Sequence, residues 1–112
     1  MHEPLGIAPI KLVSEFPKDT PVVFITSKID EEVPYECTKN LAQALANAGH
    51  NEVYIIELEK SRHSWYAMDN AQDIELYLTA MHAIYKHYEL PYIEEYASKA
   101  QPIEKFLVSK IQ

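Results

Sequence analysis

Glycine is scarce in this chain, with only Gly6 and Gly49 among 112 residues that include seven prolines. Loops that wrap around phosphates and strained turns that expose a nucleophilic serine need glycine, because it alone combines close backbone approach with positive φ angles at low cost. The motifs G-x-G-x-x-G, G-x-x-x-x-G-K-[ST] and G-x-S-x-G are all absent from the sequence. The sequence therefore excludes nucleotide binding through these loops and excludes a self-contained serine-hydrolase nucleophile turn.

Composition is that of a single globular domain, with 47% apolar and 24% charged residues. Ten basic and 17 acidic side chains give a formal net charge of −7, which repels nucleic-acid phosphates and anionic lipids. The longest apolar runs, 22–25 and 53–56, are too short to span a bilayer, and the first residues lack a secretory-signal pattern. The lone Cys37 cannot form an intrachain disulfide. We expect a chain of a reducing compartment, by default the cytoplasm, that binds neither nucleic acid nor membranes.

The apolar patterning predicts an α/β fold with a parallel sheet. Residues 22–27 and 53–58 are continuous runs rich in β-branched residues, typical of strands covered on both faces. The intervening residues 35–48 predict a helix, and Gly49 follows where a left-handed cap is favoured. Its predicted apolar stripe consists of Cys37, Leu41, Ala44, Leu45 and Ala48. Strand, helix and strand in this order form a parallel crossover unit.

A longer helix is predicted over residues 70–88, where apolar side chains recur every three or four positions. The stripe consists of Ile74, Tyr77, Leu78, Met81, Ile84, Tyr85 and Tyr88. We interpret the chain as one α/β unit with a core at 21–91, a lead-in at 1–20 and a helical tail at 92–112. Two strands leave two open sheet edges. Either the lead-in contains another strand or, as we favour, the sheet is completed by self-association or by the remainder of a longer chain.

Two residues stand out by their positions after the predicted strands. Asp30 follows the first strand and His63 lies five residues beyond the second. Because the strands are parallel, both loops leave the same end of the sheet, where α/β proteins bind ligands. A carboxylate there can accept a hydrogen bond from imidazole Nδ1 and stabilise the imidazolium that forms when Nε2 takes a proton. The pair forms the base and orienting acid of a nucleophilic triad.

The segment Asp30-Glu31-Glu32-Val33-Pro34, followed by a helix, a strand and the loop that carries His63, resembles the C-terminal part of an α/β-hydrolase. The resemblance covers residues 21 to about 91, roughly two thirds of the chain. It implies that Asp30 is the triad acid and His63 the triad histidine, and that the reaction is ester, thioester or amide hydrolysis by acyl transfer without a cofactor. Small ester-type substrates are the implied ligands.

The chain also departs from the α/β-hydrolase pattern. Arg62 stands where members of the family often have glycine before the histidine. The nucleophile turn precedes the acid in the family, and the 29 residues before Asp30 contain none. We therefore expect a C-terminal fragment that carries two thirds of a triad and is inactive alone. The alternatives are a non-catalytic, self-associating interaction module and, with less support, a small flavodoxin-like regulator.

Simpler interpretations of the same residues stay open. Asp30 taken alone is typical of a turn or a helix cap. Glu31 and Glu32 are typical of a solvated helix start, where negative charge is favourable. Glu32 is a minor alternative to Asp30 as the triad acid. Trp65 and Tyr66 either line an acyl pocket or hold the loop in place. Cys37 is predicted to be buried and inert. Surface positions are predicted for the other histidines, His2, His50, His82 and His87. We expect no metal site, because no spacing of potential ligands suggests one.

Overall fold

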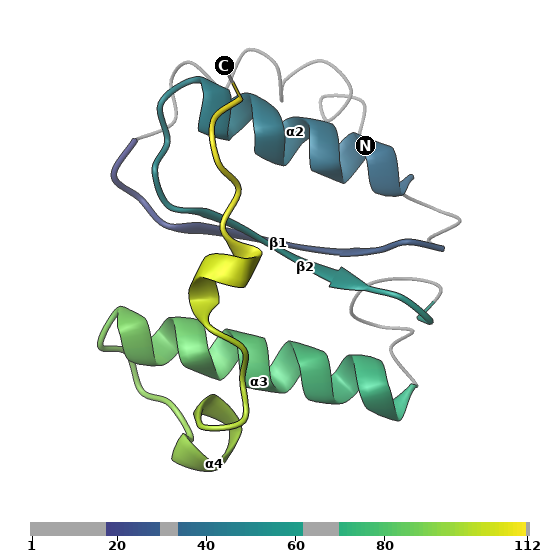
Figure 1. Cartoon of the computed structure of the whole chain (residues 1–112), viewed down its shortest axis with the longest axis vertical. Helices are drawn as coiled ribbons and strands as arrows, with labels where there is room; N and C mark the ends of the chain where they lie inside the picture. Colours follow the sequence, from purple (N-terminus) through teal and green to yellow (C-terminus); the bar gives the residue numbers. More distant parts are fainter. Residues whose placement is uncertain (1–17, 30–33, 62–69, 112) are drawn as a thin grey trace, which may run out of the picture.

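The computed structural model describes residues 18–29, 34–61 and 70–111. It contains a two-stranded parallel sheet with a helix on each face (Figure 1). The elements in chain order are β1 (Val22–Ser27), α2 (Tyr35–Asn47), β2 (Val53–Leu58), α3 (Ala71–His87), α4 (Glu94–Ala97) and the short 3₁₀ helix η1 (Ile103–Phe106). Both strands begin and end at the predicted residues, and the α/β class is confirmed.

The two strands pair in parallel along their full length. Val22 lies opposite Val53, and the register continues to Ser27 opposite Leu58. Because the strands run in one direction, residues that follow Ser27 and residues that follow Leu58 leave the sheet at the same end. The predicted parallel crossover is therefore present, with α2 as its helix.

The helix α2 lies on one face of the sheet and α3 on the other (Figure 1). Each face packs in its own apolar cluster. Alternate residues of a strand point to opposite faces, so Val22 and Phe24 of β1 pack in the α2 cluster while Val23 and Ile25 pack in the α3 cluster. The α2 cluster is small, with Ala42, Leu45 and Val53 at its centre. The α3 cluster is larger, with Tyr54, Ile56, Leu58, Ala80, Ile84 and Phe106 at its centre. Continuous apolar strands are needed because both faces are covered.

The helix ends follow local sequence chemistry. Asn70 is the N-cap of α3, and its side chain accepts hydrogen bonds from the backbone N–H groups of Gln72 and Asp73. After α2, Gly49 has φ +104°, which confirms the left-handed conformation predicted there. After α3, Glu89 has φ 60°, and Pro91 follows two residues later.

The predicted burial of several side chains is wrong. In α2 the buried residues are Ala42, Leu45 and Ala46, whereas Cys37 is exposed. Leu45 is buried as predicted, but Ala44 of the predicted stripe is exposed, because the alanines of this helix are too small and too evenly spread to mark one face. His50, expected at the surface, is 2% exposed, and Ile74, expected in the stripe of α3, is 38% exposed.

The C-terminal tail crosses the edge of β2 that faces away from β1 (Figure 1). Leu107 forms an antiparallel bridge with Tyr54, and the N–H of Val108 donates to the carbonyl of Val53 at 2.8 Å. The tail then reaches α2, where the Ser109 carbonyl accepts a hydrogen bond from Gln43. The described part of this tail is helical only in α4 and η1, and its extended end covers part of one sheet edge.

The other sheet edge belongs to β1. In the described part of the chain, β2 is the only strand paired with β1. Self-association through this edge stays a prediction. Among residues 18–29, 34–61 and 70–111, no helix is both long and apolar enough to cross a membrane.

Candidate functional site

The four residues predicted for the site, Asp30, His63, Trp65 and Tyr66, lie outside the described residues. The described chain nevertheless includes the residues that flank them. Ile29 precedes Asp30 directly, and Ser61 precedes His63 by two positions. The geometry of these flanking residues decides where the two predicted segments leave the sheet.

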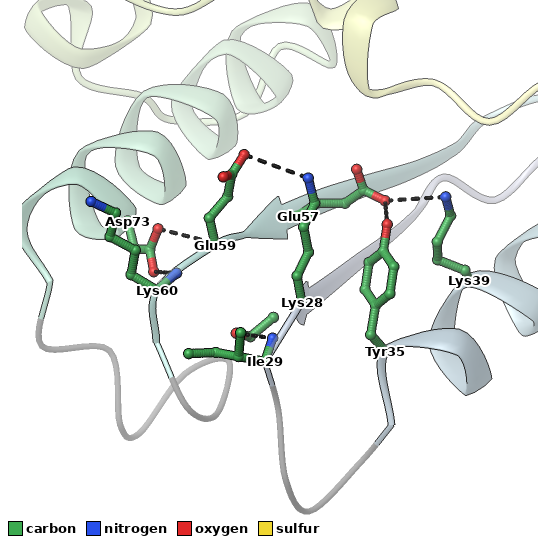
Figure 2. Close-up of polar contacts among 9 residues, drawn as sticks. Lys28, Ile29, Tyr35, Lys39, Glu57, Glu59, Lys60 and Asp73 are labelled. Atoms are coloured by element: carbon green, nitrogen blue, oxygen red, sulfur yellow. Dashed lines mark hydrogen bonds and ion pairs between the residues drawn. The ribbon is translucent and has the colours of Figure 1, made fainter.

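Direct contacts join the carboxyl ends of β1 and β2. The N–H of Lys28 donates to the carbonyl of Leu58 at 2.8 Å, which extends the strand pairing by one residue. The ammonium group of Lys28 lies 3.5 Å from Oε2 of Glu59 (Figure 2). Since both side chains are largely exposed, this ion pair contributes little to stability, but it shows that the two strand exits are adjacent.

A buried hydroxyl connects the same two exits. Oγ of Ser27 donates a hydrogen bond to the backbone carbonyl of Ser61, and both residues are 0% exposed. The N–H of Ile29 points back to Oγ of Ser27 at 3.4 Å. Ser27 and Ser61, three residues before Asp30 and two before His63, are thus held side by side.

Asp73, in the first turn of α3, completes this network. Its Oδ2 accepts hydrogen bonds from the N–H of Lys60 at 3.0 Å, the N–H of Ser61 at 2.7 Å and the hydroxyl of Ser61 at 2.7 Å. Its Oδ1 accepts one from the N–H of Glu59 at 3.2 Å (Figure 2). The side chain is buried, with Asp73 3% exposed. One carboxylate therefore binds three successive backbone N–H groups after β2.

The protonation of Asp73 follows from this environment. Burial alone would raise the pKa of its carboxyl, but the hydrogen bonds from Ser61, Glu59 and Lys60 outweigh burial and lower it. All of these donors favour the ionised form. Asp73 is therefore a charged, buried acceptor in the native protein.

The roles of Ser27, Ser61 and Asp73 were not predicted from the sequence. A signal for Asp73 was present: Asn70 and Asp73 have the spacing of a helix N-cap and its third helical residue, a position where carboxylates accept N–H groups. The partner could not be read from the sequence, because Asp73 binds a different segment rather than its own cap. Ser27 and Ser61 do not act as nucleophiles here, since both hydroxyls are buried and already donate hydrogen bonds.

A second polar cluster lies where α2 begins. The hydroxyl of Tyr35 donates to Oε2 of Glu57 at 2.6 Å, and the ammonium group of Lys39 lies 3.6 Å from the same oxygen (Figure 2). Burial, followed by the Glu57 carboxylate, raises the pKa of Tyr35. The cluster ties the start of α2 to β2. In the described ranges, no three His, Cys, Asp or Glu side chains gather in a way that could hold a metal ion.

Comparisons of the chain with protein families, with curated proteins and with solved structures find no match. The likeness to α/β-hydrolases therefore rests on the sequence pattern alone. What the described residues define is a parallel strand–helix–strand unit whose two strand exits are joined by hydrogen bonds.

Proposed function

We propose that this chain is the C-terminal portion of an α/β-hydrolase-like serine hydrolase, with Asp30 as the acid and His63 as the base of its triad. The observation that supports the proposal is the junction of the strand exits. Ser27 and Ser61, three residues before Asp30 and two before His63, are joined by a buried hydrogen bond. A separation of only two or three residues lets the two side chains reach each other across this end of the sheet.

The chemistry of the proposal follows from the two side chains. The Asp30 carboxylate would accept a hydrogen bond from Nδ1 of His63 and so present Nε2 as the base. Nε2 would take the proton of a serine hydroxyl supplied by a separate or preceding polypeptide, and would then give it to the leaving group of an ester, thioester or amide. The present serines lie in no G-x-S-x-G turn. The chain alone is therefore expected to be inactive.

A titration of the histidines tests the Asp30–His63 pair in this chain. The five imidazoles can be followed by NMR between pH 4 and 9 and assigned with single His→Gln variants. We expect the pKa of His63 to lie about one unit above the ordinary value of about 6.5, because a neighbouring carboxylate stabilises the imidazolium. Asp30→Asn should remove this rise.

Matched variants in the same loop control for a general charge effect. Glu31→Gln and Glu32→Gln remove the same charge one and two residues further along and should leave the pKa of His63 within about 0.3 units. A His63 pKa that does not respond to Asp30→Asn contradicts the proposal. A larger response to Glu32→Gln would transfer the role of acid to Glu32.

An esterase assay tests the missing nucleophile. The chain should hydrolyse p-nitrophenyl acetate no faster than the His63→Ala variant does at equal concentration. Rapid hydrolysis that disappears in His63→Ala would contradict the statement that this chain lacks a nucleophile. A G-x-S-x-G motif in the reading frame upstream of residue 1 would support the proposal from the genomic side.

A self-associating interaction module is the second candidate, favoured by the environment of β1. Four successive apolar residues of β1, 22–25, are only half-buried, although clusters cover both faces of the strand. Pairing of this edge with a second copy would bury them further. Light scattering should then show an oligomer at micromolar concentration, and a folded monomer would argue against the module.

A further inference from the structure

We infer that Asp73 is a positioning residue for the His63 segment, acting through the backbone of residues 59–61. This inference rests on the function proposed above and adds a residue that the family resemblance does not include. Its basis is the geometry of described residues only: a buried carboxylate, four donors, and a hydroxyl that connects the strand exits.

Three successive N–H groups point to one carboxylate at the end of β2. Such a run of N–H groups forms a concave anion-binding surface, and the Asp73 side chain occupies it at 2.7 to 3.2 Å. Each bond constrains one peptide plane, so the three together determine the direction in which the chain leaves Ser61. A single hydrogen bond would let the backbone rotate about it, whereas three bonds to one carboxylate leave the backbone of residues 59–61 little freedom to rotate.

Asp73 departs from the usual role of its helix position. A carboxylate at the third residue of a helix commonly turns back to the N–H of its own N-cap. In α3 the N-cap Asn70 accepts the N–H groups of Gln72 and Asp73 in the usual way, but the Asp73 carboxylate accepts hydrogen bonds from the end of β2. The first turn of α3 therefore holds the chain at both sides of residues 62–69, through Ser61 before them and Asn70 after them.

A hydrogen bond to β1 extends the role of Asp73 beyond the end of β2. Ser61 donates its hydroxyl to Asp73 and accepts the Ser27 hydroxyl at its carbonyl. Asp73, Ser61 and Ser27 thus form one chain of hydrogen bonds from α3 through the β2 exit to the β1 exit. Asp73 is suited to maintain the distance between the segments that carry Asp30 and His63.

The test is the dependence of the Asp30–His63 coupling on Asp73. The coupling is the pKa difference of His63 between a chain with Asp30 and the same chain with Asp30→Asn, measured by NMR. In the Asp73→Asn background we expect this difference to fall to less than about half, because the amide nitrogen cannot accept the N–H and hydroxyl donors that now meet Oδ2.

Glu75→Gln is the matched control, since Glu75 is an exposed carboxylate two residues away on the same helix. It removes the same charge and should leave the coupling unchanged. Ser61→Ala removes one of the four donors and should give an intermediate coupling. If Asp73→Asn does not fold, Ser61→Ala decides the test in its place.

The outcomes separate the two proposals. Coupling that is absent in the unmodified chain overturns the proposed function and, with it, this inference. Coupling that is present in the unmodified chain and undiminished in folded Asp73→Asn overturns only the positioning role. Loss of the Asp30–His63 coupling in Glu75→Gln as well would also overturn the positioning role, because the loss would then come from the removed charge rather than from the released backbone.

Discussion

The strands β1 and β2 have the same length, run in the same direction and contain similar residues, yet they are buried to different extents. In β2, Val53, Ile56 and Leu58 are 0% exposed, whereas residues 22–25 of β1 are all half-buried. The difference lies at the sheet edges. β2 has β1 on one side and residues Leu107–Val108 on the other, while the described chain adds no strand to the second side of β1.

The contrast shows that apolar sequence and burial are separate properties of a strand. Both strands are apolar enough for a central position, but burial also requires a neighbour at each edge. The unpaired edge of an apolar strand can pair with a further strand, which would continue the sheet. Both functional candidates, a hydrolase portion and a self-associating module, require such a continuation.

The largest expected effect comes from a matched pair of isoleucines. Ile25 and Ile56 lie opposite each other in the register and share the α3 cluster, but only Ile56 is 0% exposed. We expect Ile56→Ala to lower the free energy of unfolding by about 3–4 kcal/mol and Ile25→Ala by about 1–2 kcal/mol. Urea denaturation measures both. Equal losses would mean that β1 is as fully covered in solution as β2.

Asp73→Asn tests how firmly the β2 exit is held. We expect it to lower the free energy of unfolding at pH 7 by about 2–3 kcal/mol, because buried donors lose a charged acceptor. The native pKa of Asp73 is lowered, so the contribution of this carboxylate is present above about pH 4 and is lost as the pH falls through its native pKa. Denaturation should show the same difference between Asp73→Asn and the unmodified chain at pH 7 and pH 5, and a smaller difference at pH 3. A constant difference would contradict the ionised state of Asp73.

Val108→Pro tests the edge protection that distinguishes β2 from β1. Proline removes the N–H that donates to Val53, and Leu107 already has φ −75° and ψ 133°, a conformation that a following proline accepts. We expect a loss of about 1–2 kcal/mol. Val108→Ala is the control, because it keeps the N–H and shortens only the side chain. If both variants lose the same amount, the hydrogen bond does not contribute.

The smallest effect is expected at the exposed ion pair between the two exits. Lys28→Ala should change the free energy of unfolding by less than about 0.5 kcal/mol, since Lys28 and Glu59 are well solvated. The change should shrink further in 0.5 M NaCl. A loss above about 1 kcal/mol that persists in salt would indicate that this end of the sheet is shielded from water.

Much of the secondary structure could be predicted from local patterns. The apolar runs predicted β1 and β2 to the residue, Gly49 was predicted to follow α2, and the helix predicted over 70–88 differs from α3 by one residue at each end. The buried face of α2 could not be predicted, because alanine is compatible with both faces of a helix. The path of the C-terminal tail could not be predicted from local sequence either, since its bridge to Tyr54 joins positions more than fifty residues apart.

The candidate site divides in the same way. Chain order predicts Asp30 and His63, and they remain predictions, whereas the residues that hold the strand exits together are evident only from the tertiary structure. Local sequence was sufficient for strands, helix caps and the absence of a nucleophile turn, because those depend on neighbours within a few residues. The network of Ser27, Ser61 and Asp73 depends on tertiary packing, since serine and aspartate become buried hydrogen-bonding partners only when distant segments bring a donor and an acceptor together out of water.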